Sequence, residues 1–228
     1  MATAAEVIEA SRDYHPAFDE RRVPEASALR VLSRLQRRLA AKVTALSEDA
    51  LAAPFAFLAA DVSAAALAGF AGAGLALPDH LLLLGFFTSR LAGPVSTVPV
   101  SLVSYANYPV EAARYWPSCF VLRGRLYPAN RMELGFGGSL HGWEAFNGLS
   151  ALLVLNPPEL TARADEITLP DIAQDALVTG LAWWMAGRAG VAREVVWLQQ
   201  DATDAEQTVV TALADQESTS TWTVVRTR

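Results

Sequence analysis

The sequence predicts an α+β fold in which helices from both ends of the chain form a scaffold carrying a small inserted antiparallel β-sandwich or curled sheet. Leucines spaced three and four residues apart run through residues 24–47, short apolar runs separated by turn residues fill the middle of the chain, and helical spacing returns after Leu169. We therefore expect four parts: an N-terminal helical part (1–74), an inserted β domain (75–160), C-terminal helices that pack on the N-terminal helix (161–218), and an extended C-terminal tail (219–228).

The composition suggests that much of the chain is buried or covered by a partner. Of 228 residues, 52% are apolar and only 18% are charged, whereas an average soluble domain has about 25% charged residues. The length suffices for one large domain or for a helical part with a small β domain. The single cysteine, Cys119, cannot form an internal disulfide. We expect it to be a small buried hydrophobic residue, which suits a reducing cytoplasm.

Neither a signal peptide nor a membrane span is expected. Glu6 and Glu9 lie where a signal peptide needs basic and then purely apolar residues. The apolar stretch Val62–Pro78 is short and ends in proline, and the charge-free stretch Leu91–Val110 contains three prolines. A transmembrane helix needs about 20 mostly apolar residues, so we predict no membrane insertion.

The clearest element is an amphipathic helix within Pro24–Ser47. Its apolar residues fall on one side of the helix, and four arginines fall on the opposite side. Pro24 suits a helix start, and Glu25 places a negative charge at the positive end of the helix dipole. The apolar face comprises Leu29, Leu32, Leu35, Leu39, Val43 and Leu46, and the arginine face comprises Arg30, Arg34, Arg37 and Arg38.

The first half of the chain contains one further predicted helix and one ambiguous segment. Ala4–Tyr14 is expected to be a short helix with Val7 and Ile8 inward. Residues 50–74 are rich in alanine but interrupted by proline and glycine, so we expect short helical or extended pieces that cross the core.

Residues 75–160 have the pattern of short strands. Turn residues separate the apolar runs, and Arg123–Gly124–Arg125 indicates a tight hairpin between two of them. The expected strands are Leu81–Thr88, Val95–Val103, Phe120–Leu122, Leu126–Tyr127 and Leu149–Leu155.

Two helices and a tail are expected after the strands. Pro170 or Asp171 opens a helix that Gly187 and Gly190 close, and its apolar stripe faces the leucines of the long helix. The inward residues of that stripe are Ile172, Ala173, Ala176, Leu177, Gly180, Leu181, Trp184 and Met185. A last helix is expected within Arg193–Asp215, followed by the β-prone tail STSTWTVVRTR.

No motif predicts catalytic, cofactor-binding or metal-binding residues. Ser139 lacks the glycine two positions later that a nucleophile elbow needs, and His141–Glu144 does not form HExxH. The glycines at 69, 72 and 74 match no phosphate-binding loop. An enzyme whose site the sequence hides stays an alternative.

Two features remain open to several interpretations. The arginine face can be a solvated surface with ion pairs, a docking face for acidic neighbours or a surface that faces DNA. Residues 1–42 carry 8 basic and 6 acidic residues (net +2), and the remainder carries 10 and 18 (net −8), so the arginines lie on an otherwise acidic molecule. The tail can be a disordered end or a strand added to a neighbouring sheet.

The sequence resembles the head–tail connector (adaptor or neck) proteins of tailed bacteriophages, a group that includes podophage tail tubular protein A. The resemblance rests on the arginine-studded helix ALRVLSRLQRRLAAKV, the β-rich middle, and a strand that ends in NPPEL, followed by a spacer and the helix start LPD. The segments that depart from this pattern are residues 50–74 and the tryptophan-bearing tail.

The resemblance implies a structural virion protein in the neck between capsid and tail, assembled in the host cytoplasm. Such a protein forms a ring, commonly of twelve subunits, that contacts the portal protein, neighbouring copies of itself and the next neck or tail component. Genomic DNA passes through the lumen without sequence-specific binding. Arg30, Arg34, Arg37 and Arg38 are then expected at subunit interfaces, and the portal-docking residues would be Trp222, Val224, Val225, Arg226 and Arg228. A second class stays open as an alternative: another viral or cellular assembly protein, such as a stopper, a tail terminator or a ring-forming scaffold protein.

Overall fold

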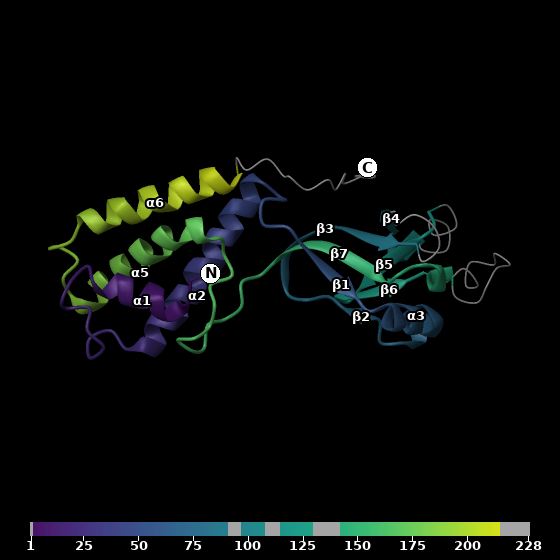
Figure 1. The fold of residues 1–228 in the computed structure, drawn as a ribbon, viewed down its shortest axis with the longest axis horizontal. Helices are drawn as coiled ribbons and strands as arrows, with labels where there is room; N and C mark the ends of the chain where they lie inside the picture. Colours follow the sequence, from purple (N-terminus) through teal and green to yellow (C-terminus); the bar gives the residue numbers. More distant parts are fainter. Residues whose placement is uncertain (1, 91–96, 108–114, 130–141, 215–228) are drawn as a thin grey trace. The chain divides into compact units, whose positions relative to one another are not determined.

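The computed structural model describes residues 2–90, 97–107, 115–129 and 142–214, and these residues confirm the α+β fold (Figure 1). They form two compact units. The helical unit contains the described residues up to Leu51 and from Asn156 onward, and the sheet unit is Ala52–Leu155. The sheet unit is therefore an insertion within the helical unit, as predicted.

Both ends of the chain contribute to the helical unit. Figure 1 shows α5 beside α6, and α5 packs against α1, α2 and α6. The buried side chains of the helical unit form one apolar core that includes Ile8, Leu32 and Leu181. The helices are α1 (Ala4–Arg12), α2 (Glu25–Leu46), α5 (Gln174–Ala189), which the 3₁₀ turn η4 (Asp171–Ala173) precedes, and α6 (Trp197–Ala214).

The termini of these helices follow from local sequence. Thr3 and Glu6 form a capping box at the start of α1, and these hydrogen bonds to Thr3 lower the pKa of the Glu6 carboxyl. Gly190 ends α5 in the left-handed conformation (φ 81°), which a residue without a Cβ adopts at little cost. Gly187, also expected to close this helix, lies inside it.

The apolar face of α2 is confirmed over most of its length. Leu29, Leu32, Leu39 and Val43 are buried, and Leu35 packs against the core from a partly exposed position. The prediction for Leu46 is wrong, because this last residue of the helix is 65% exposed. In the C-terminal helical stripe, Ile172 is also exposed; it belongs to η4 and not to the regular helix.

The sheet unit contains one curled sheet with the strand order β1-β7-β3-β4-β5-β6-β2. Every neighbouring pair is antiparallel except β4 and β5, which are parallel, so the sheet is mixed and not purely antiparallel. The strands are β1 (Ala53–Phe57), β2 (Leu75–Ala76), β3 (His80–Ser89), β4 (Thr97–Leu102), β5 (Ser118–Leu122), β6 (Arg125–Pro128) and β7 (Leu149–Leu155).

The predicted hairpin joins β5 to β6. Arg123 and Gly124 both have positive φ (51° and 72°), as a two-residue hairpin turn of the I′ type requires. Cys119 on β5 is fully buried, as expected for a small core residue, and this burial raises the pKa of its thiol.

The sheet unit has its own core, which one helix and one 3₁₀ turn help to close. Helix α3 (Ala59–Ala68) packs against β2, β6 and the turn η3 (Gly142–Ala145). Trp143 is fully buried, and its indole Nε1 donates a hydrogen bond to the Ala129 carbonyl oxygen at 2.7 Å. The buried indole therefore has the polar partner that it needs.

The boundaries between the units differ from the predicted ones. We expected residues 50–74 in the helical part, but β1 pairs with β7 and α3 contributes Val62 and Ala66 to the core of the sheet unit. The sheet unit therefore begins at Ala52 instead of residue 75 and ends at Leu155 instead of residue 160. The physical reason is that this alanine-rich segment buries its apolar side chains against strands and not against α2.

Candidate subunit interface on the helical unit

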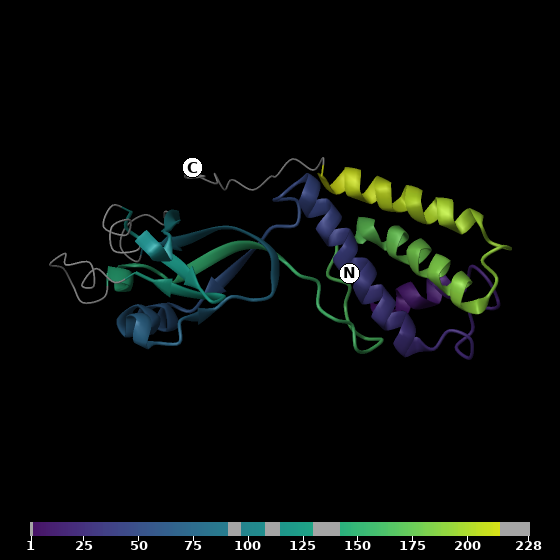
Figure 2. The same cartoon turned by 180° about the vertical axis from the view of Figure 1, so that it is seen from behind.

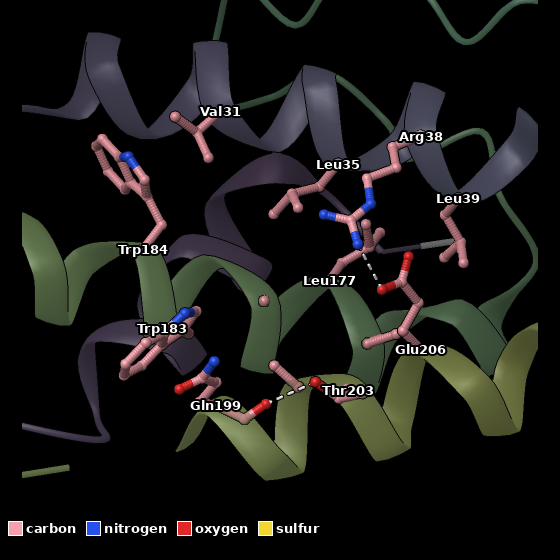
Figure 3. Close-up of a pocket in the computed structure, with 13 residues that line it drawn as sticks. Val31, Leu35, Arg38, Leu39, Leu177, Trp183, Trp184, Gln199, Thr203 and Glu206 are labelled. Carbon is pink, nitrogen blue, oxygen red and sulfur yellow. Dashed lines mark hydrogen bonds and ion pairs between the residues drawn. The ribbon is translucent and has the colours of Figure 1, made fainter. Parts of the chain in front are cut away.

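An apolar groove lies between α2, α5 and α6 of the helical unit (Figure 3). Its volume is about 360 Å³. Val31 and Leu35 come from α2, and Trp184 comes from α5. A second hollow of about 420 Å³ borders the same tryptophan. The other residues that line the groove are Arg38, Leu39, Ala176, Leu177, Gly180, Trp183, Gln199, Ala202, Thr203 and Glu206.

Small residues on α5 and α6 explain why the groove is open. Gly180 has no side chain, and a Cβ there would lie 3.5 Å from Cδ1 of Leu35. Ala176 and Ala202 add only methyl groups. Trp183 and Trp184 are therefore only partly buried, and the groove presents aromatic surface of the kind that is enriched in protein interfaces.

Ion pairs join α2 to α6 at one end of the groove. The Glu206 carboxylate lies 3.0 Å from Arg38 Nη2 and 2.7 Å from Lys42 Nζ (Figure 3 shows Arg38 and Glu206). Both cations are on α2, and each such exposed pair contributes at most about 1 kcal/mol. They add a polar contact between α2 and α6 at this end of the groove.

The predicted arginine face divides into two pairs with different roles. Arg37 Nε donates a hydrogen bond to the Pro157 carbonyl oxygen at 3.0 Å, and Arg38 pairs with Glu206. Arg30 and Arg34 are exposed and form no ion pair with any residue that the structure describes. Of the four arginines, only Arg30 and Arg34 can therefore use the whole guanidinium group to contact another molecule.

Polar residues on the buried side of α2 hold the segment that follows β7. Ser33 Oγ accepts a hydrogen bond from the Leu160 amide and lies 2.9 Å from the Leu29 carbonyl oxygen. Gln36 Oε1 accepts a hydrogen bond from the Thr168 amide at 3.2 Å. Neither residue was predicted to have a role, although a serine and a glutamine three positions apart within an apolar helix face are an unusual pattern that could have indicated one.

Replacement of Ser33 by alanine is expected to destabilise the helical unit by about 1–3 kcal/mol. The buried Leu160 amide would lose its hydrogen-bond acceptor, and an unsatisfied buried donor costs this amount. Urea unfolding followed by circular dichroism measures the change. Ser27→Ala on the same helix is the control, and an equal loss in both variants would contradict the role of Ser33.

Asp165 closes a turn in the same segment. Its carboxylate accepts hydrogen bonds from the Thr161 and Ala162 amides at 2.6 and 2.9 Å, and these bonds lower the pKa of Asp165. Its carbonyl oxygen accepts a hydrogen bond from the Ala4 amide at 2.9 Å. The turn therefore helps to attach the start of the chain to this segment.

The stability of this turn is expected to depend on pH. Because the pKa of Asp165 is lower in the folded state, its carboxylate stabilises the fold at neutral pH, and this contribution is lost as the pH falls through the folded-state pKa. Asp165→Asn is expected to unfold at a lower urea concentration than the native chain at pH 7, and the difference should shrink in acid. A constant difference from pH 7 to pH 3 would contradict this role.

A second exposed surface, which we call the α6 outer stripe, lies on the side of α6 that faces away from the core of the helical unit. Trp197, Asp201 and Asp204 are spaced by four and three residues, so they share one face of the helix. All three are exposed, and Trp197 is 48% accessible although its ring lies 6.0 Å from that of Tyr14. This stripe was not predicted, although the spacing rule applied to the other helices would have found it.

The other predicted site residues are those of the C-terminal tail. Trp222, Val224, Val225, Arg226 and Arg228 lie outside the described residues. Within the described ranges, no three histidine, cysteine or acidic side chains gather as metal ligands would. A search of these ranges for a helix with the length and hydropathy of a membrane span finds none.

Comparisons with known proteins give no family for this chain. No family model matches the sequence, and a search of curated proteins finds no match.

Proposed function

We propose that this chain is a structural virion protein, a head–tail connector that forms a ring and joins the portal of a tailed bacteriophage to the tail. The observation that carries the proposal is the insertion of a complete sheet unit between α2 and α5 of a helical unit that both ends of the chain build. This is the layout that the resemblance of the sequence implies.

The helical unit has the surface properties of a ring subunit. It presents an open apolar groove, two exposed arginines on α2 and an exposed acidic stripe on α6. Apolar area surrounded by charge is typical of surfaces that become buried in an assembly. A low fraction of charged residues, 18%, fits a subunit that neighbouring copies cover.

The net charge fits passage of DNA. The chain carries a formal charge of −6. A strongly basic lumen would neutralise phosphates and retain the duplex, whereas an acidic ring lets DNA slide without sequence-specific binding. Arg30 and Arg34 are therefore assigned to contacts between subunits and not to DNA.

The remaining surfaces have proposed partners within the neck of the virion. The tail that follows α6 would dock on the portal protein, and the sheet unit would contact the next neck or tail component. Because the sheet unit has its own core, it can present such a surface without disturbing the packing of the helices.

Electron microscopy of the purified chain with and without the portal ring of the same phage tests the proposal. We expect rings with a central opening that stack on the portal and sediment with it. A chain that binds a connector ring or a tail tube but not the portal would instead be a stopper or a tail terminator. A monomer that binds none of these components would contradict the proposal.

A further inference from the structure

We infer that the α6 outer stripe of one copy docks on α2 of a second copy, with Trp197 entering the groove of that copy and Asp201 and Asp204 facing its Arg34 and Arg30. The inference rests on the proposed function and deepens it, because it assigns the two surfaces that meet between neighbouring ring subunits. The resemblance already leads us to expect the arginines of α2 at a subunit interface; the inference adds the α6 outer stripe as their partner and the groove as the site that receives Trp197.

The donor surface combines an aromatic anchor with negative charge. Trp197 is the first residue of α6, and nearly half of its side chain is exposed although tryptophan is costly to leave in water. Its neighbour Val196 is 61% exposed. Asp201 and Asp204 follow on the same face, so one helix presents a large apolar group and then two carboxylates.

The receiving surface matches the donor surface, with an apolar groove for the tryptophan and basic residues beside it for the aspartates. The groove supplies apolar contacts from Val31, Leu35 and Trp184 in a space of about 360 Å³. Clefts that enclose a small ligand begin at about 300 Å³, so one indole fits. Arg34 lies one turn beyond Arg30 on α2 and borders the groove residues in sequence.

Charge favours a second copy of this chain over other occupants. The exposed arginines lack a partner within the described residues, and the exposed aspartates of the stripe face away from the α2 of their own copy. Opposite charges that meet across an interface fix its register and exclude wrong pairings. The two surfaces differ, so each copy uses one surface toward each neighbour, and such head-to-tail contacts generate rings when the rotation closes.

Two charge-reversal variants test the contact. Arg30→Glu with Arg34→Glu makes the α2 surface acidic, and Asp201→Lys with Asp204→Lys makes the α6 outer stripe basic. Each variant alone would juxtapose like charges between copies, so we expect self-association to weaken at least about tenfold. Sedimentation velocity at low salt, with and without the portal ring, measures association.

An equimolar mixture of the two variants is the decisive sample. In alternating order, every contact in the mixture again joins an acidic surface to a basic one, so association should return to within about threefold of the native value. Arg21→Glu with Arg22→Glu reverses two exposed arginines elsewhere in the helical unit and is the control for net charge. Trp197→Ala should weaken association in the native chain, in keeping with its role as the anchor.

The outcomes separate this inference from the proposed function. Rings or portal complexes that form equally well in all variants would overturn the inference and leave the connector proposal standing. Absence of self-association and of portal binding in the native chain would overturn both. Failure of the mixture to recover while each variant stays folded by circular dichroism would also overturn the inference.

Discussion

Deletion of Thr219–Arg228 is expected to abolish attachment of the chain to the portal ring. The tail has an alternating pattern of apolar and hydroxyl residues ending in two arginines, which suits a strand added to a partner's sheet with backbone hydrogen bonds supplying the affinity. The core residues that the structure describes in both units all precede the deletion, so we expect the truncated chain to fold. Co-sedimentation with purified portal rings measures the loss.

Shorter changes separate the contributions of the tail. Replacement of Trp222, Val224 and Val225 by serine keeps the length and removes the apolar contacts, and it should reproduce most of the loss. Replacement of Arg226 and Arg228 by glutamine should weaken binding mainly at low salt, because exposed charges are screened as salt rises. A truncated chain that still sediments with the portal would show that the tail is not the docking element.

Leu32→Ala is expected to destabilise the helical unit by about 2–5 kcal/mol. Leu32 is fully buried in the core between the helices, and removing its branched side chain leaves a cavity in addition to the lost burial. This is a large part of the stability of a typical domain, about 5–15 kcal/mol. Chemical unfolding followed by far-ultraviolet circular dichroism gives the change in free energy.

Leu46→Ala on the same helix is the matched control. The substitution is identical, but Leu46 is 65% exposed, so its effect should stay within about 0.5 kcal/mol. Similar losses at both positions would mean that Leu46 is also covered. If Leu46→Ala changed portal or ring assembly without changing stability, the exposed leucine would instead belong to an interface.

The helices were predictable because their signals are local. The three- and four-residue spacing of leucines in α2 lies within one continuous segment, and four of the six predicted residues are buried. The turn at Arg123–Gly124 likewise needs only two adjacent residues that adopt positive φ. Whether Leu46 is covered depends on where the neighbouring elements end, and the spacing of the leucines does not specify those positions.

The domain boundary was not predictable in this way. The alanines and glycines of residues 50–74 favour no particular packing partner. Their placement depends on pairing with a strand about 100 residues later in the chain, as in the pair Ala53 and Leu153. Spacing within a segment specifies which face is apolar but not which distant segment covers it.

The candidate site was predicted in part. The four arginines were identified as a face, but their division into Arg37 and Arg38 with partners in the same chain and Arg30 and Arg34 without a described partner required the positions of Pro157 and Glu206. The groove also could not be predicted, because it arises where small residues of two helices meet. The α6 outer stripe could have been found from its spacing alone.

The pairing of β1 with β7 has a consequence for the order in which the chain folds. The two halves of the helical core are separated by a loop of roughly 100 residues, Ala52–Leu155, and closing so long a loop costs entropy. Ala53 lies opposite Leu153, so a sheet that has already formed brings both ends of the loop together. This shortens the effective loop by about five doublings and lowers the closure cost by about 3 kcal/mol. Early formation of the inserted sheet therefore speeds the packing of α2 against α5.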